Sequence, residues 1–146
     1  MKFATVFASL AVFALPIFAE TVEVTYNTNY DDASFPLSST ACSNGVNGLE
    51  SKYPTLGSIP NFPNVGGIPG LVWNSTLCGT CWTLTYTEES GSTNEIFIFA
   101  VDESYTFDIS LSAMNLLTGG IAVEKGTVNA TAAQWLTNVD CGSFPN

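Results

Sequence analysis

Four cysteines follow an apolar leader, and this combination constrains the fold more than any other feature of the chain. Residues 1–19 comprise a short basic start, an uncharged apolar run and a small residue before Glu20, which is the pattern of a secretory signal peptide. A membrane anchor is the alternative, but Pro16 interrupts the run and no basic cluster follows it. The sequence therefore predicts a signal peptide at 1–19 and one exported domain at 20–146.

The cysteines are Cys42, Cys78, Cys81 and Cys141. An even number in an exported chain predicts two disulfides, and three pairings are open. Cys78 and Cys81 also form a CxxC, which occurs in redox and zinc sites. No second CxxC and no βαβ pattern accompany it, so structural disulfides are the favoured interpretation.

Charge and composition exclude several classes of function. Removing residues 1–19 removes Lys2, which leaves two lysines against thirteen acidic residues and a formal net charge of −11. Such a chain cannot neutralise a phosphate backbone, so neither nucleic-acid binding nor adsorption to an anionic membrane is expected. The chain has no histidine, which excludes histidine-dependent triads and histidine-ligated metals. No cofactor or metal is expected.

Short strand-like runs dominate the domain. Alternating or continuous apolar residues predict strands at 20–26, 82–86, 95–101, 121–128 and 131–139, with a hairpin turn at 88–92. Helical patterns are confined to 48–53 and 110–117, the second of which ends at Gly119-Gly120. Residues 54–72 are rich in proline and glycine and predict an ordered loop or a broken strand. About six short strands without long helices favour a closed β-barrel.

Several segments together resemble the cerato-platanin family of small secreted fungal proteins. They cover almost the whole domain: Val24-Thr25-Tyr26, Tyr30-Asp31-Asp32, Ala41-Cys42-Ser43-Asn44-Gly45, Asn47-Gly48-Leu49, Ile59-Pro60-Asn61-Phe62-Pro63, Gly66-Gly67, Trp73-Asn74-Ser75, Cys78-Gly79-Thr80-Cys81-Trp82, Ala100-Val101-Asp102, Phe107, Ala113-Met114-Asn115, Leu117-Thr118 and Cys141. The resemblance implies a mainly β fold, a six-stranded double-psi β-barrel with two short helices. It also implies the disulfides Cys42–Cys78 and Cys81–Cys141.

The resemblance further implies a location in the fungal cell wall or outside the cell. Its expected partners are chitin or other β-1,4 oligosaccharides and a plant receptor, without a membrane span. The expected function is a non-catalytic elicitor of plant defence, as a monomer or with weak self-association. Two alternatives remain: a weak expansin-like or endoglucanase activity, and self-assembly at interfaces, for which the apolar residues of 59–72 are the candidate patch.

Two aspartates are the first candidates for sugar binding. Asp102 follows an apolar strand, and in related expansins and endoglucanases such an aspartate lines the saccharide groove. A water-exposed carboxylate at a strand end is the alternative. Asp108 precedes the second predicted helix, where the family commonly has asparagine, and either faces the groove or caps the helix. If both face the groove, the pKa of one carboxyl is expected to rise.

The opening strand and three tryptophans supply further candidates. Tyr26-Asn27 matches a Tyr-Asp pair of many relatives, and asparagine cannot act as a base there. Asn44 likewise stands where the family commonly has aspartate. Trp73 is a candidate for stacking on a sugar ring, with core packing as the alternative, whereas Trp82 is expected in the core. Trp135 is open to either interpretation.

The remaining sequence features predict surface positions. Asp31-Asp32 and Glu88-Glu89 are expected in solvated turns, with calcium binding as the weaker alternative. Asn74 and Asn129 begin the sequons Asn74-Ser75-Thr76 and Asn129-Ala130-Thr131, which makes both candidate glycosylation sites.

Overall fold

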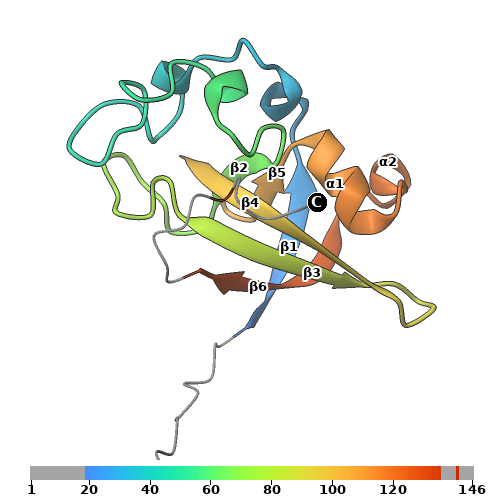
Figure 1. Ribbon diagram of the computed structural model, residues 1–146. Coiled ribbons are helices and arrows are strands. Elements are labelled where there is room, and N and C mark those ends of the chain that lie inside the picture. Colours follow the sequence, from blue (N-terminus) through green and yellow to red (C-terminus); the bar gives the residue numbers. More distant parts are fainter. Residues whose placement is uncertain (1–18, 136–140, 142–146) are drawn as a thin grey trace, which may run out of the picture.

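The structure is a computed structural model that describes residues 19–135 and Cys141. Six strands close into a barrel in the order β1-β5-β2-β4-β3-β6 (Figure 1). They are β1 Glu20–Tyr26, β2 Val65–Ile68, β3 Cys81–Thr87, β4 Thr93–Glu103, β5 Phe107–Ile109 and β6 Val128–Gln134. The described helices are α1 Leu111–Thr118, α2 Ala122–Lys125 and the short 3-10 helices η1 Thr28–Asp31, η2 Leu37–Ser39 and η3 Leu56–Ser58. The predicted mainly β barrel is confirmed, whereas the predicted signal peptide falls almost entirely outside the described residues.

The pattern of hydrophobic residues explains the strands of the barrel. In β6, buried Val128, Ala130 and Ala132 alternate with exposed residues and face the barrel interior. β3 and β4 pair antiparallel along their shared length, and the backbone N–H of Glu88 donates to the Ser92 carbonyl at 2.8 Å to close the hairpin. The expected strands at 20–26, 82–86 and 95–101 and the turn at 88–92 are confirmed.

Three expected elements differ from the structure. Residues 48–53 form turns rather than a helix, because a single i→i+4 hydrogen bond, from Tyr53 to Leu49, precedes Pro54. The expected strand at 121–128 is instead α2 followed by the start of β6. The described part of the expected strand at 131–139 is the second half of β6, and residues 136–140 lie outside the described residues. The short strands β2 and β5 escaped prediction because four and three residues carry too little periodicity.

Helix α1 covers the barrel end at which β1, β3 and β5 finish. Met114 and Leu117 are completely buried against the barrel interior. Asn94 Nδ2, at the adjacent start of β4, donates to the Leu117 carbonyl at 3.1 Å. Gly119, in the left-handed conformation at φ 70°, ends the helix as predicted. This end of the barrel is therefore closed by packed side chains.

A second hydrophobic cluster lies outside the barrel. We define the loop layer as residues 27–64 and 69–80, which Figure 1 shows gathered over one side of the barrel. In β4, Ile98 and Ala100 face the interior, whereas Phe99 and Val101 pack against the loop layer. Tyr53 meets Phe99 edge-on, with ring centroids 5.9 Å apart. The loop layer is thus an ordered second shell of the fold.

Two disulfides fasten the irregular segments. The structure joins Cys42 to Cys78, with Cα atoms 5.5 Å apart, within the loop layer. It also joins Cys81, at the start of β3, to Cys141, with Cα atoms 5.6 Å apart. This pairing is the one that the family resemblance implies, and described residues hold no free cysteine.

Candidate functional site

A cleft of about 540 Å³ opens where β4 and the loop layer meet. One wall is the loop after β2 and the other is the connection from β4 to β5. The lining residues are Gly70, Leu71, Val72, Asp102, Glu103, Ser104 and Tyr105. Asp102, the first candidate from the sequence, therefore does line a groove.

A β-bulge turns Asp102 toward the loop layer. By alternation alone, Asp102 would point into the barrel with Ile98 and Ala100. The register of β2 against β4 shifts, however, so that Gly66 is opposite Ala100 and Gly67 is opposite Asp102. Such a shift moves the following side chain to the other face of the sheet. The bulge thus brings the Asp102 carboxylate out of the apolar interior.

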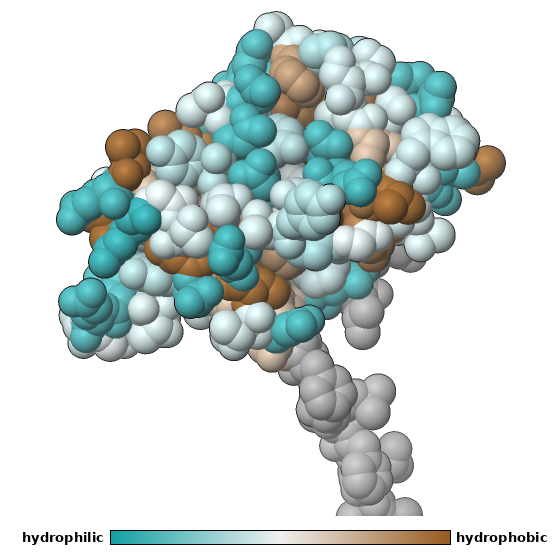
Figure 2. All heavy atoms as spheres, turned by 180° about the vertical axis from the view of Figure 1, so that it is seen from behind, coloured by the Kyte–Doolittle hydropathy of each residue, from teal (hydrophilic) through white to brown (hydrophobic). Residues whose placement is uncertain are grey.

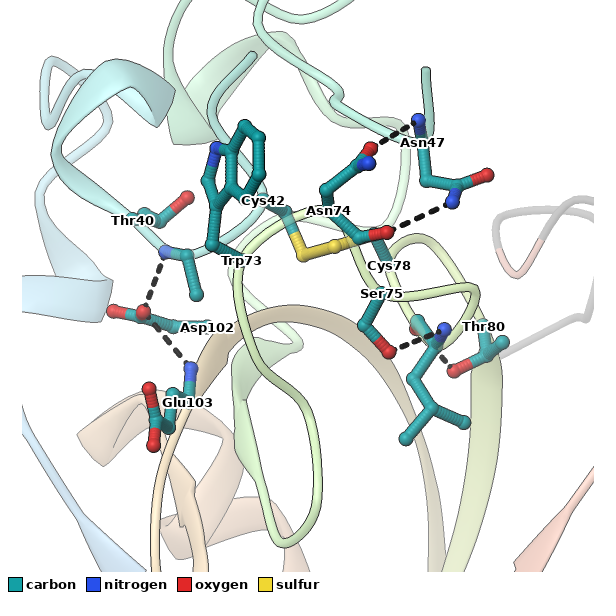
Figure 3. Close-up of a disulfide and its surroundings, with 12 residues drawn as sticks. Thr40, Cys42, Asn47, Trp73, Asn74, Ser75, Cys78, Thr80, Asp102 and Glu103 are labelled. Carbon is teal, nitrogen blue, oxygen red and sulfur yellow. Dashed lines mark hydrogen bonds between the residues drawn. A yellow bond between two sulfur atoms is a disulfide. The ribbon is translucent and has the colours of Figure 1, made fainter. Parts of the chain in front are cut away.

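The Asp102 carboxylate is held by three donors. Its Oδ1 accepts from the backbone N–H groups of Ala41, at 2.8 Å, and Glu103, at 2.9 Å (Figure 3). Its Oδ2 accepts from the Tyr30 hydroxyl at 3.1 Å. The side chain consequently joins β4 to two points of the loop layer, and its position is fixed before any ligand arrives.

Tyr30 is a buried donor to this carboxylate. Its side chain is only 4% exposed, and burial raises the pKa of its phenol well above the usual value. The charges of Asp102 and Asp108 and the hydrogen bond to Asp102 raise that pKa further. The phenol therefore stays protonated at physiological pH, and its O–H donates a hydrogen bond to Asp102.

Asp108 lies on the other side of β2 from Asp102. Both are register partners of Gly67, so their Cα atoms are two strand spacings, about 10 Å, apart. Asp108 Oδ1 accepts from the Thr25 hydroxyl at 2.8 Å, and that hydroxyl also meets the Thr106 hydroxyl. The alternative prediction, that Asp108 caps the helix, is wrong. Ser110 is the N-cap of α1, and its side chain accepts a hydrogen bond from the backbone N–H of Ala113.

The space between the two carboxylates is filled. A Cβ placed on Gly67 would lie 3.0 Å from Ser104 Cβ and 3.3 Å from the Tyr30 hydroxyl. Those two side chains therefore occupy the position above Gly67, where a substrate would have to lie between two catalytic carboxylates. Asp102 and Asp108 therefore belong to separate groups of hydrogen bonds, and Asp108 lies outside the cleft lining.

Tyr26 and Asn27 do not line the cleft. Tyr26 is half-buried against the barrel interior. The Asn27 side chain accepts from the backbone N–H of Asn29 at 3.0 Å and caps η1. Asn27 therefore supports η1, the helix that carries Tyr30 to Asp102.

Trp73 is an exposed aromatic beside the cleft. It follows Val72 in the chain, and 60% of its surface is exposed. Its Nε1 donates to Asn44 Oδ1 at 2.8 Å, which fixes the indole ring on the loop layer. Figure 3 shows Trp73 and Asp102 on one side of the Cys42–Cys78 disulfide and the Asn47–Asn74 contact on the other.

Sequence reasoning missed Tyr105 and Val72. Tyr105 is fully exposed on one wall of the cleft, and Val72, 52% exposed, lies on the other. The signal was present for Tyr105, since an aromatic residue two positions after a strand end belongs to an exposed turn. Nothing in the sequence places the loop with Val72 opposite that turn.

The other acidic and aromatic candidates have structural roles. Asp31 was expected in solvent, but its carboxylate accepts from the backbone N–H groups of Leu111, at 2.7 Å, and Ser112, at 2.9 Å, and so caps α1. Asp32 is exposed as expected, and hydrogen bonds from Ser34 lower its pKa. Trp82 packs edge-on against Phe107 at 5.3 Å, in agreement with its expected core position. These contacts leave the cleft as the main candidate site.

Among the described residues, no group of histidine, cysteine and carboxylate side chains is arranged to hold a metal ion. No helix in the same part of the chain has the length and hydrophobicity to cross a bilayer.

Comparison with known proteins identifies the family. The family model described as Cerato-platanin matches residues 22–143. The chain belongs to the cerato-platanin family. Curated relatives include Allergen Asp f 15 of Aspergillus fumigatus, which is 46% identical over 75% of this chain and 70% of its own length. Cerato-platanin of Ceratocystis fimbriata f. sp. platani is 42% identical over 79% of this chain and 84% of its own.

Solved cerato-platanin structures have the same fold. Cerato-platanin 1 from M. perniciosa aligns with a TM-score of 0.79 at 38% identity, covering 82% of this chain and 98% of its own. The solution structure of the fungal elicitor Cerato-Platanin aligns with a TM-score of 0.70 at 41% identity, covering 83% of this chain and 97% of its own. The cerato-platanin resemblance noted in the sequence is therefore confirmed.

Proposed function

We propose that this protein is secreted and wall-associated, binds chitin-type β-1,4 oligosaccharides in the Asp102 cleft and acts as an elicitor of plant defence. One observation carries the binding proposal: a fixed carboxylate lies in a cleft whose rim carries exposed aromatic side chains. Sugars combine apolar ring faces with hydroxyl groups, so they need both an aromatic surface and a few fixed polar partners. The elicitor role is supported by the similarity to the fungal elicitor Cerato-Platanin.

The hydrogen bonds of Asp102 suit a sugar hydroxyl. Its carboxylate already accepts from two backbone N–H groups and one phenol, so its role is that of an acceptor. A sugar hydroxyl would add a further donor at a remaining lone pair. The cleft lining contains no lysine or arginine, in agreement with a neutral ligand.

We propose that the protein does not hydrolyse its ligand. Hydrolysis requires an acid and a base, or a nucleophile, on opposite sides of the scissile bond. The Asp102 carboxylate is already engaged by two backbone N–H groups and the Tyr30 hydroxyl. The gap toward Asp108 is filled by Ser104 and Tyr30. Prolonged incubation with labelled chitin and cellulose oligomers is therefore expected to give no product, and turnover abolished in Asp102→Asn would contradict this.

The interface-active alternative lacks its expected patch. The candidate surface was formed by the apolar residues of 59–72, of which Ile59, Val65, Ile68 and Leu71 are buried and Phe62 is partly buried. Within 59–72, Val72 is the strongly exposed apolar residue. On the face that Figure 2 shows, hydrophobic residues reach the surface in patches among hydrophilic ones. The structure gives sugar binding more support than surface assembly.

Isothermal titration with a chitin tetramer tests the proposal. The wild type is expected to bind in the micromolar to millimolar range. Tyr105→Ala should weaken binding by about three- to tenfold, since one aromatic stacking contact is lost. Asp102→Asn should weaken it by about fivefold, because the charge is lost while the shape and most hydrogen bonds remain.

Val123→Ala, at an exposed residue of α2, is the matched control. It should bind like the wild type. Equal affinity of Tyr105→Ala and the control would contradict the cleft as the sugar site.

The structure also separates the two candidate glycosylation sites. Asn129 is exposed on β6, with its neighbours Val128 and Ala130 facing inward. Asn74 is half-buried, and its Oδ1 accepts from the backbone N–H of Asn47 at 3.0 Å. Its backbone carbonyl accepts from the Asn47 side chain at 2.8 Å. We propose Asn129 as the glycan acceptor and Asn74 as a structural contact.

A further inference from the structure

The two ends of the barrel interior differ in how completely they are filled. At one end, Met114 and Leu117 of α1 are completely buried. At the end where β1, β3 and β5 begin, Leu71 and Cys42 of the loop layer cover part of the interior. Beside them remains a pocket of about 350 Å³, which we call the barrel-end pocket. It is lined by Val22, Trp82, Phe107 and Ala132, with Pro69, Glu20 and Gln134 around them.

The barrel-end pocket is distinct from the sugar cleft. Pro69 lines the pocket, whereas the next residues, Gly70 to Val72, line the cleft. The short loop after β2 therefore separates the two cavities. The cleft is bordered by a carboxylate and exposed aromatics, whereas the barrel-end pocket is built from side chains that belong to or pack against the interior core.

The pocket walls are held in place. Trp82 Nε1 donates to the Thr80 hydroxyl at 2.9 Å, and its ring meets Phe107 at 68°. Rotation of the indole ring into the empty space would break both contacts. Val22 and Ala132 are fixed by the pairing of β1 with β6. The cavity is therefore a preformed concavity rather than a gap that side-chain rotation closes.

Charge and size define the ligand. Among the lining residues, Glu20 has a carboxylate and, after removal of residues 1–19, also the α-amino group that balances it, and the lining contains no lysine or arginine. With a formal net charge of −11 after removal of residues 1–19, the domain repels anions. A volume of about 350 Å³ lies at the lower end of the range of small-molecule sites. We propose that the barrel-end pocket binds one small, uncharged, apolar or aromatic molecule against Trp82.

Two probes with the same ring system test this proposal. N-phenyl-1-naphthylamine is uncharged, and 8-anilinonaphthalene-1-sulfonate adds a sulfonate. The uncharged probe is expected to bind one to one with a rise in its fluorescence, and the sulfonate to bind at least about tenfold more weakly. Equal or stronger binding of the sulfonate would overturn the assignment.

A variant that fills the pocket locates the probe. Ala132→Leu adds apolar volume at the wall and should weaken the uncharged probe by about tenfold or more. Leu116→Ala, at an exposed residue of α1, should leave binding unchanged. Retained binding in a folded Ala132→Leu protein, or loss in Leu116→Ala, would contradict the proposal.

The wild-type protein provides a second readout that needs no variant to fold. The indole N–H signals of the tryptophans report separately on the two cavities in a nitrogen–proton NMR spectrum. The uncharged probe should shift the Trp82 signal and leave that of Trp73 in place. A shift confined to Trp73 would overturn the barrel-end site, whereas chitin oligomers test the cleft independently.

Discussion

The barrel interior and the loop layer are organised by different interactions. Interior residues such as Leu84 and Ile98 repeat with strand periodicity and are completely buried. The loop layer is irregular, and it is held by a disulfide, by cluster residues such as Leu37 and by the hydrogen bonds of Asp102. The interior therefore supplies a rigid scaffold, while the cleft forms where the loop layer meets it.

The largest loss of stability is expected from removing the disulfide of the loop layer. Cys42→Ala/Cys78→Ala opens a loop of 36 residues, and chain entropy assigns about 4 kcal/mol to that closure. The melting temperature should fall by more than about 10 °C, and sugar binding should be lost with it. Thermal melts by circular dichroism measure the effect. A change of only a degree or two would mean that other contacts hold the loop layer.

The second prediction concerns a substitution that destabilises the barrel but leaves the cleft intact. Met114→Ala leaves a cavity beneath α1 and should cost about 2–5 kcal/mol in unfolding free energy. Affinity for chitin oligomers should stay within about twofold of the wild type while the protein is folded. Denaturant titration gives the stability, with Leu116→Ala as the exposed control on the same helix. A matching loss of affinity in Met114→Ala would show that scaffold and cleft are coupled.

The third prediction concerns pH. The pKa of Tyr30 is higher in the folded protein than the ordinary value of 10.0, so folding favours the protonated phenol. The stabilisation is fully present below pH 10, and it falls as the pH rises above 10 because only the unfolded chain releases the proton. Melting temperatures from pH 8 to 11.5 should therefore fall less steeply in Tyr30→Phe than in the wild type. Parallel curves would contradict the buried hydrogen bond to Asp102.

The smallest expected effect concerns the two sequons. After secretion from a fungal host, Asn129→Gln should remove the glycan mass and leave the melting temperature within about 2 °C. Asn74→Gln should keep the glycan mass but loosen the contact with Asn47. Mass spectrometry with and without deglycosylation shows which of the two variants has lost the glycan. A glycan lost only in Asn74→Gln would reverse the assignment.

The sequence predicted the regular part of the molecule better than the site. Alternating residues located β1 and β3, because burial on one face imposes a period of two, and a nearly continuous apolar run located β4. The sequence placed Asp102 at a strand end, but it was mainly the family resemblance that placed it in the groove, since alternation would have turned it into the barrel. The bulge opposite Gly67 is set by tertiary packing, which no local pattern encodes.

The same limit explains Asp31 and Tyr105. Asp31 caps a helix that begins 80 residues later, so its role depends on how the loop layer folds over α1. Tyr105 reaches the cleft only because the loop after β2 lies opposite. Long-range contacts of this kind require the structure, whereas turns and strands are visible in the sequence.

The central claim is that sugars bind where the loop layer meets β4. Residue-by-residue NMR titration with a chitin tetramer tests it most directly. The account predicts shifts concentrated at Val72, Trp73, Glu103 and Tyr105, with a change of less than about twofold in affinity between 50 and 500 mM salt. Shifts centred on the outer face of β6 or on α2, or strong weakening by salt, would contradict it.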